Sequence, residues 1–288
     1  MSALLEVRNL SRSFGGICAV DSLSFDAERS GITGLIGPNG AGKTTVFNLI
    51  TGVYLPDRKP TATEAVAGTV RLNGNDLIGK RPHEIVQAGV ARTFQNIRLF
   101  NRMTCLENVM TPLLVRGTSG PLAALFRTKS MRGEEARARE TALLILKNMG
   151  LADMADRIAS TLPYGLQRKL EIARALACLP PIEPAEDMPA PKLQPRFPRL
   201  LLLDEPAAGM NEAETGELGE TIVKVREGFD LAILLIEHHI SLVMDVCTHI
   251  VVMDRGALLA EGTPNAVRND EKVVAAYLGN PQKRRRRT

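Results

Sequence analysis

Short apolar runs alternate along the chain with longer segments whose apolar positions recur every three to four residues. Each short run predicts a β-strand, and the runs occupy residues 4–10, 23–26, 32–36, 68–73, 200–204, 232–236 and 250–253. A helix is predicted from Gly42 to about Thr51, and Thr263 with Pro264 suits the N-cap and first position of another. Strands that alternate with helices are typical of an α/β fold.

A different pattern covers residues 96–178, which are mostly helical in character. One apolar stripe of an amphipathic helix recurs at i, i+4, i+7 and i+11 and is formed by Ala138, Ala142, Ile145 and Met149. We interpret this stretch as a helical subdomain inserted into the α/β core. The core then comprises residues 1–95 and 179–288.

Two segments stand apart by composition. Residues 180–198 hold seven of the 17 prolines, so we expect a surface loop there, with a partner-binding segment as the alternative. The end of the chain, residues 281–288, is strongly basic. Removing the five cations at 283–287 from the net charge of +4 leaves −1, so the basic character belongs to this tail. We expect a solvated tail, with contact to anionic lipid or an acidic partner as the alternative.

Composition and charge narrow the class of protein. Because the body of the chain carries almost no net charge, we expect no nucleic-acid partner. The first ten residues do not form a signal peptide, and the longest apolar stretches are far shorter than the ~20 residues of a membrane-spanning helix. The four cysteines are widely spaced, and we expect them to be buried thiols of a cytoplasmic chain.

A glycine-rich segment links the strand predicted at 32–36 to the helix that follows it. The segment fits the phosphate-loop pattern GxxxxGK[ST] and consists of Gly37, Pro38, Asn39, Gly40, Ala41, Gly42, Lys43, Thr44 and Thr45. Glycines let backbone N–H groups surround the phosphates of a nucleotide, and the helix N-terminus adds partial positive charge. We expect Lys43 to bridge the β- and γ-phosphates and the Thr44 hydroxyl to bind Mg²⁺.

The strand predicted at 200–204 is apolar throughout and ends in two adjacent acids. Its carboxyl end is the place where open parallel sheets bind ligands. We expect Asp204 to belong to the magnesium shell and Glu205 to accept a proton from the attacking water. The alternative, an acidic turn after a buried strand, does not account for the phosphate loop in the same chain.

Further segments resemble the motif set of ABC ATPases, and the resemblance covers nearly the whole chain. Residues 162–176 (LPYGLQRKLEIARAL) resemble the signature helix, the acids 204–205 the Walker B motif, and 236–238 the switch histidine. Residues 91–100 (ARTFQNIRLF) look like the Q-loop of one branch, the ATP-binding subunit of branched-chain amino acid importers. Residues 206–211 (PAAGMN) and 276–279 (AYLG) are similar to the same branch, although a lipopolysaccharide-export ATPase has a segment close to AYLG.

The resemblance implies a RecA-like ABC ATPase core with an antiparallel β lobe and the inserted helical subdomain. It also implies that two such subunits close head to tail, with ATP between the phosphate loop of one and Pro163 and Gly165 in the signature of the other. Gln95 would bind Mg²⁺ and sense the γ-phosphate. His238 would contact the γ-phosphate and orient Glu205, whereas the neighbouring histidine has no matching role.

Two further features concern the nucleotide-binding residues. Phe14 would stack on the adenine ring, in a chain that has few other aromatic candidates. The signature departs from the family pattern at Pro163, where Ser or Ala is usual, and at Leu166, where a polar residue is usual. These changes remove a hydroxyl and a polar side chain, whereas Gly165 and the helix dipole are retained.

The resemblance thus implies an ATPase that uses ATP and Mg²⁺ to import branched-chain amino acids, at the cytoplasmic face of the bacterial inner membrane. Its implied partners are a second ATPase subunit, identical or different, two permease subunits and, indirectly, a periplasmic binding protein. A different cargo, such as an amide, urea or lipopolysaccharide, is the first alternative, because cargo contacts other subunits. A soluble ABC ATPase of DNA repair or translation is disfavoured by the single phosphate loop and the absence of sustained heptads.

Overall fold

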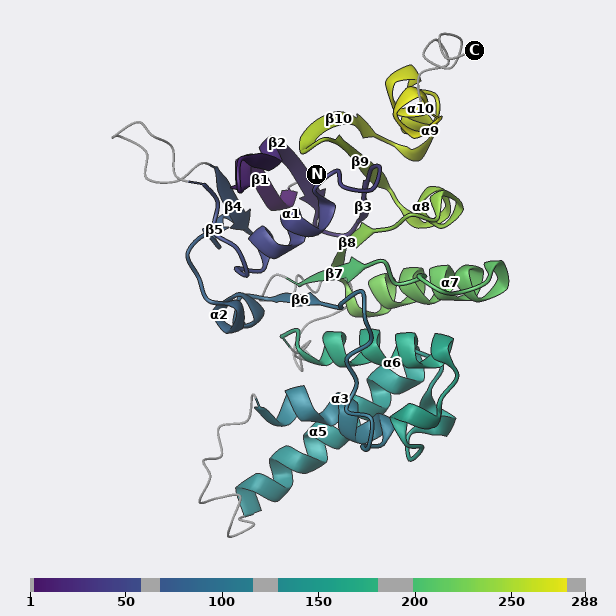
Figure 1. Cartoon of the computed structure of the whole chain (residues 1–288). Helices are drawn as coiled ribbons and strands as arrows, with labels where there is room; N and C mark the ends of the chain where they lie inside the picture. Colours follow the sequence, from purple (N-terminus) through teal and green to yellow (C-terminus); the bar gives the residue numbers. More distant parts are fainter. Residues whose placement is uncertain (1–2, 58–67, 116–128, 181–198, 279–288) are drawn as a thin grey trace, which may run out of the picture.

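Two β-sheets form the frame of the molecule. The structure is a computed structural model, and it describes residues 3–57, 68–115, 129–180 and 199–278. Within these residues, the larger sheet has six strands in the order β10-β9-β3-β8-β7-β6, and the smaller has four in the order β2-β1-β4-β5. Figure 1 shows the two sheets in the upper part of the molecule and a group of helices below them.

The central strands of the larger sheet are buried on both faces. β3 (Ile32–Ile36), β7 (Leu200–Asp204) and β8 (Ala232–Ile236) are parallel, fully buried and identical in extent to the predicted runs. Their side chains alternate between two apolar clusters, so that Leu200 and Leu202 belong to one and Leu201 and Leu203 to the other. A strand that is covered on both faces is apolar at most positions, which explains why the sequence predicts these three strands.

The edges of this sheet are less visible in the sequence. β6 (Val90–Arg92) pairs parallel with β7, and β10 (Ala257–Gly262) pairs antiparallel with β9 (His249–Asp254). The apolar pattern predicts β9 but neither β6 nor β10. β6 has only three residues and β10 has no fully buried residue, so neither forms an apolar run long enough to recognise.

The smaller sheet is antiparallel throughout, and β1 lies between β2 and β4. β1 (Ala3–Phe14) and β2 (Ile17–Glu28) are longer than the runs predicted there. They are joined through Gly15 and Gly16, whose φ angles are 53° and 86°. Both angles lie in the left-handed region, which glycine adopts without a steric penalty. β4 (Thr69–Leu72) and β5 (Asn75–Asp76) complete the sheet.

Helices cover both faces of the larger sheet. α1 (Lys43–Ile50) packs with the smaller sheet on one face, and α7 (Glu212–Phe229) and α8 (Ile240–Val246) pack on the other (Figure 1). α2 (Pro82–Gln87), which was not predicted, precedes β6. The last helices of the described residues are α9 (Pro264–Arg268) and α10 (Glu271–Leu278). The Thr263 side chain caps α9 as predicted by accepting a hydrogen bond from the Ala266 N–H.

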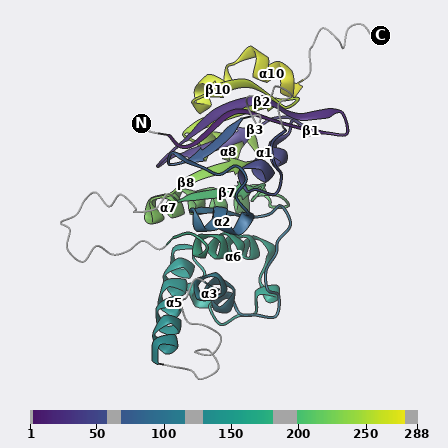
Figure 2. The same cartoon turned by 90° about the vertical axis from the view of Figure 1, so that its left-hand side faces the viewer.

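The lower part of the molecule is helical, as both Figure 1 and Figure 2 show. It contains α3 (Cys105–Val115), α5 (Lys129–Asn148) and α6 (Tyr164–Ala177), with short 3-10 turns at Ala152–Met154 and Ala159–Thr161. The predicted stripe is buried: Ala138, Ala142 and Ile145 lie on α5, and Met149 directly follows it. The exact bounds of an inserted subdomain at 96–178 remain a prediction.

The other expectations have mixed outcomes. Cys105 and Cys247 are buried as predicted. Cys178 is only partly buried and Cys18 is exposed on β2, so the prediction of four buried thiols was wrong for Cys18 and only partly right for Cys178. Apart from Pro180, the proline-rich segment 180–198 lies outside the described residues, and so does the basic tail 281–288. Among the helices that the structure describes, none combines the length and the apolar character needed to cross a bilayer.

Candidate nucleotide site

The phosphate loop connects the carboxyl end of β3 to α1. Gly40 and Gly42 have φ angles of 80° and 98°, in the left-handed region. A Cβ atom on Gly42 would lie 2.1 Å from the carbonyl oxygen of Ala19, so no side chain fits there. Gly42 is the N-cap of α1, and the helix begins at Lys43, one residue later than predicted. The partial positive charge of this helix N-terminus therefore lies directly at the loop.

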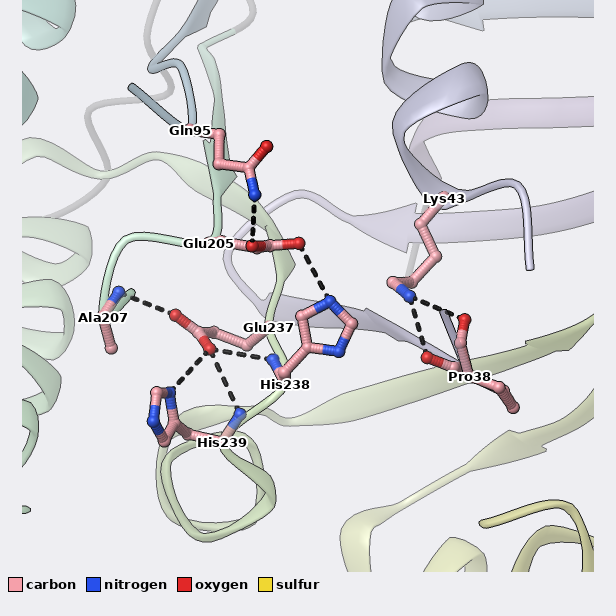
Figure 3. Close-up of polar contacts among 9 residues, drawn as sticks. Pro38, Lys43, Gln95, Glu205, Ala207, Glu237, His238 and His239 are labelled. Atoms are coloured by element: carbon pink, nitrogen blue, oxygen red, sulfur yellow. Dashed lines mark hydrogen bonds and ion pairs between the residues drawn. The ribbon is translucent and has the colours of Figure 1, made fainter. Parts of the chain in front are cut away.

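The Lys43 side chain is folded onto the loop from which it arises. Its Nζ donates hydrogen bonds to the carbonyl oxygens of Gly37 at 2.8 Å and Pro38 at 3.1 Å (Figure 3). Only 6% of Lys43 is exposed, and this burial lowers the pKa of its ammonium group, while Glu205 and Asp204 act in the opposite direction. Phosphate oxygens could replace the two carbonyl oxygens as acceptors.

Three predicted catalytic residues are joined by hydrogen bonds. Glu205 Oε1 lies 2.9 Å from His238 Nε2, and Glu205 Oε2 accepts a hydrogen bond from Gln95 Nε2 at 2.8 Å (Figure 3). His238 follows β8, Glu205 follows β7 and Gln95 follows β6. These strands are neighbours in the sheet, so their carboxyl ends lie side by side. Glu205 itself has a φ of 48°, an unfavourable value for a residue with a side chain.

Asp204 lies deeper than Glu205, at the last position of β7. Its Oδ2 forms an ion pair with Arg92 Nη2 at 2.7 Å, and only 4% of the carboxylate side chain is exposed. Burial raises the pKa of Asp204, and the hydrogen bond and charge of Arg92 oppose that shift. The acid predicted for the magnesium shell is therefore paired with an arginine that was not predicted to contribute.

A hollow of about 700 Å³ unites most of the predicted residues. Ala19 of β2 contributes to its wall, and the predicted residues that line it are Asn39, Gly40, Ala41, Gly42, Lys43, Thr44, Thr45, Gln95, Glu205 and His238. A larger groove of about 940 Å³ between α7 and α8 contains no phosphate-loop residue. The smaller, more polar hollow is therefore the candidate nucleotide site.

Phe14 does not line this hollow. It is the last residue of β1, and its ring packs edge-on against Tyr54 with 5.1 Å between centroids. The Arg12 guanidinium lies over the same ring at 4.7 Å. The Phe14 side chain is 37% exposed, so one part of the ring remains available. Adenine stacking on Phe14 stays a prediction.

The two predicted signature residues lie at the start of α6, away from the hollow. Pro163 is the N-cap of this helix, and its carbonyl oxygen accepts hydrogen bonds from the N–H groups of Leu166 and Gln167. A Cβ on Gly165 would meet only side-chain atoms of Met210 and Glu214, at 3.8 and 3.9 Å. These are ordinary contacts, so nothing within the described chain requires glycine at this position.

Glu237 is a site residue that the sequence analysis did not assign. Its carboxylate is buried and accepts hydrogen bonds from the Ala207 N–H at 2.7 Å and the His238 N–H at 2.8 Å (Figure 3). His239, which had no predicted role, contacts the same carboxylate through Nδ1 at 3.3 Å. Glu237 thus connects the loop after Glu205 to the backbone of His238. Most of its partners are backbone N–H groups, which leave no mark in a sequence motif.

Arg168 also went unassigned. It is buried on α6 and donates hydrogen bonds to the carbonyl oxygens of Phe94 and Gln95 and to the Tyr164 hydroxyl. It forms an ion pair with Glu171 at 3.2 Å, three residues further along the same helix. The signature helix is thereby fastened to the segment that carries Gln95. A buried arginine and glutamate three positions apart on a helix could have indicated this role.

The residues predicted to bind Mg²⁺ offer the donor atoms that this ion prefers. Thr44 has an exposed hydroxyl, and Asp204 contributes a carboxylate. Gln95 uses its amide nitrogen to bind Glu205, which leaves the amide oxygen as its metal-binding atom. Hydroxyl, carboxylate and amide oxygens are hard ligands, so this donor set fits Mg²⁺.

Comparison with known proteins agrees with the geometry. Residues 20–183 match the family model described as ABC transporter, and residues 257–281 match the one described as branched-chain amino acid ATP-binding cassette transporter. The high-affinity branched-chain amino acid transport ATP-binding protein BraF of Pseudomonas aeruginosa is 42% identical over 96% of this chain and 98% of its own. The high-affinity branched-chain amino acid transport ATP-binding protein LivG of Escherichia coli is also 42% identical, over 96% of this chain and 98% of its own.

Solved structures support the fold. The ADP conformation of MJ1267, an ATP-binding cassette of an ABC transporter, superposes with a TM-score of 0.75. It is 30% identical in sequence, and the match covers 97% of this chain and 100% of that chain. The predicted RecA-like α/β fold with an antiparallel β lobe is confirmed.

The chain belongs to the ABC transporter family, and it is an ATP-binding ATPase. Within this family it is a member of the branched-chain amino acid group of ATP-binding proteins, together with BraF and LivG. Its place in a transporter implies membrane permease subunits as partners.

Proposed function

We propose that this chain hydrolyses ATP to drive the import of branched-chain amino acids across the bacterial inner membrane, at whose cytoplasmic face it binds. The observation that carries the proposal is the convergence of Lys43, Gln95, Glu205 and His238 on one hollow. The 42% identity to BraF and LivG supports the cargo.

Glu205 is the general base in this proposal. The carboxylate takes a proton from a water molecule, whose oxygen forms a bond to the γ-phosphorus while the bond to the ADP oxygen breaks. Gln95 and His238 hold the two carboxylate oxygens, so that the side chain is oriented before ATP arrives. Phosphoryl transfer depends mainly on such positioning and on charge stabilisation, because little covalent chemistry is left to the protein.

Lys43 and the magnesium ligands neutralise the triphosphate. The Lys43 ammonium exchanges its two loop carbonyl partners for β- and γ-phosphate oxygens. Thr44, Gln95 and Asp204 would hold Mg²⁺, which supplies positive charge to the phosphate oxygens when it is bound. The phosphate-loop backbone supplies N–H groups to the same oxygens, and the partly exposed Phe14 stacks on the base.

A second ATPase subunit completes the site in this proposal. Pro163 and Gly165 do not line the hollow of their own chain, and a methyl group would be tolerated at Gly165 in the isolated chain. A glycine without an internal reason is consistent with close approach of a nucleotide bound to a partner. If the two subunits differ, the site served by Pro163 and Leu166 lacks a hydroxyl and a polar side chain and should be the slower one.

The surface near Gln95 suits a permease subunit. Phe94 and Phe100, which flank this glutamine, are exposed although they are large and apolar. Next to them, a hollow of about 280 Å³ between α2, β6 and α6 is lined by Ile85, Phe94 and Cys178, among others. We infer that two permease subunits bind this face, one on each ATPase subunit, with a periplasmic binding protein on the far side of the membrane.

Isolation of the intact complex tests this proposal. The tagged chain is purified from membranes of its own host in mild detergent, its partners are identified by mass spectrometry, and ATP-dependent leucine uptake is measured in proteoliposomes. A Lys43→Ala complex, assembled in the same way, is the matched control and should not transport. Co-purification with permeases that carry an amide or urea, or with a lipopolysaccharide-export complex, would contradict the proposed cargo.

A further inference from the structure

Arg92, the last residue of β6, is buried beside Asp204 and lines the hollow of about 280 Å³ between α2, β6 and α6. Only 8% of its side chain is exposed. Its Nη2 donates to Asp204 Oδ2 at 2.7 Å, and its Nη1 donates to Asn48 Oδ1 at 2.7 Å. One planar guanidinium therefore connects β7 and α1 to the strand on which it lies. A lysine ammonium is a single point of charge and does not offer this fork.

Two aromatic rings hold the guanidinium in place. Its central carbon lies 5.4 Å from the centroid of Phe47 on α1 and 5.4 Å from that of Phe94, two residues further along the chain. Rings at this distance attract the cation, and they exclude water from the ion pair with Asp204. The bond to Asp204 is therefore stronger than an equivalent bond at the surface.

Each partner of Arg92 belongs to an element that carries a proposed magnesium ligand. Asn48 lies four residues after Thr44 on α1, so both are on one face of that helix. Gln95 follows Arg92 by three residues, and Asp204 is bound directly. Arg92 lies in the same segment as Gln95. Among the described residues of this segment, its side chain is the one that forms hydrogen bonds to both α1 and Asp204.

We propose that Arg92 is a positioning residue for Mg²⁺, which fixes Thr44, Gln95 and Asp204 relative to one another before the metal and nucleotide bind. This inference rests on the proposed function, because it concerns the metal site of the same ATPase. Residues that orient metal ligands typically change metal affinity by about 10- to 100-fold when they are replaced. Arg92 does not touch the nucleotide in this proposal, so binding of metal-free nucleotide should depend on it only weakly.

The test compares nucleotide affinity with and without the metal. The dissociation constant of a fluorescent, non-hydrolysable ATP analogue is measured on the purified chain in EDTA and again in saturating Mg²⁺. The metal ratio is the dissociation constant in EDTA divided by the constant in Mg²⁺. For Arg92→Met, we expect this ratio to fall by about 10-fold or more, with the EDTA constant changed less than about threefold. Arg92→Lys, which keeps the charge but cannot reach both partners, should fall between Arg92→Met and the wild type.

Two further variants make the result specific. Arg98→Met is the matched control, because Arg98 also lies over the Phe94 ring, at 4.5 Å, but has no contact with Asp204. Its metal ratio should equal that of the wild type. Asn48→Ala keeps the ion pair and removes the shorter of the two hydrogen bonds from Arg92 Nη1, while the bond to Thr51 Oγ1 at 3.4 Å and the contact with Phe47 remain, so it should lower the ratio by a smaller factor. It also provides the test if Arg92→Met does not fold.

The outcomes separate this inference from the proposed function. The positioning role would be overturned if Arg92→Met and Asn48→Ala both kept the wild-type metal ratio. It would also be overturned if they lost nucleotide affinity equally in EDTA and in Mg²⁺. The ATPase assignment would stand in both cases. If the wild-type chain itself binds the analogue equally well with and without Mg²⁺, the proposed magnesium site is wrong. A reduced ratio in Arg92→Met with an unchanged one in Arg98→Met supports the inference.

Discussion

The Nε2 atom of His238 lies 2.9 Å from the Oε1 atom of Glu205, although the two residues are 33 positions apart in the chain. The sheet accounts for their proximity, because β7 and β8 are paired parallel and Asp204 lies opposite Ile236. The residues that follow the two strands therefore emerge at the same edge. Gln95, which follows β6 on the other side of β7, completes the arrangement by binding Oε2.

Glu237→Gln should impair both stability and turnover. An amide has one acceptor oxygen in place of two, so either the Ala207 N–H or the His238 N–H would lose its partner. A buried group left without a hydrogen bond costs about 1–3 kcal/mol, which urea denaturation would detect as a lower free energy of unfolding. The exposed residue Glu227 on α7 is the control, and Glu227→Gln should change stability by less than about 0.5 kcal/mol. Equal behaviour of the two variants in denaturation and ATPase assays would refute the role of Glu237.

Gly165→Ala should separate folding from catalysis. The added methyl has room in the single chain, so the free energy of unfolding should stay within about 1 kcal/mol of the wild type. In the assembled transporter, ATP turnover should fall by about 10²-fold or more, because the methyl would displace the partner's nucleotide from the helix N-terminus. Thermal denaturation of the isolated chain and ATPase assays of the complex are the two measurements. A complex with full turnover would argue against head-to-tail pairing through α6.

Tyr277 should make stability sensitive to alkaline pH. Although 37% of the residue is exposed, partial burial raises the pKa of its hydroxyl to about 12, and a hydrogen bond with the Gly37 backbone partly opposes the shift. Because the unfolded chain loses this proton near pH 10, the folded state binds more protons between about pH 10 and 12. The contribution to stability is therefore complete below about pH 10 and is lost as the pH rises toward 12.

Comparison with Tyr277→Phe isolates this contribution from other groups that titrate in the same range. Between about pH 10 and 11.5, the urea midpoint of the wild type should fall more steeply than that of the variant. Parallel pH dependence of the two midpoints would show that folding does not raise the pKa of the Tyr277 hydroxyl.

The sequence predicted some parts of this site well for identifiable reasons. The strands β3, β7 and β8 were placed correctly because they are buried on both faces, and the phosphate loop because its glycines and Lys43 occur at fixed spacing. Arg92 could not be found in the same way, because its strand has three residues and its partners lie 44 and 112 positions away. The contacts of Phe14 with Tyr54 and Arg12 likewise depend on tertiary packing.

The ATPase activity of Glu205→Gln tests the central claim most directly. Glutamine preserves the shape of the side chain but cannot take a proton from water at neutral pH, so turnover of the assembled transporter should fall by ~10²–10⁴ while ATP still binds. Lys43→Ala in the same complex should differ by losing nucleotide binding as well. Turnover of Glu205→Gln within about threefold of the wild type, measured with ATP at saturation, would contradict the assignment of Glu205 as the general base.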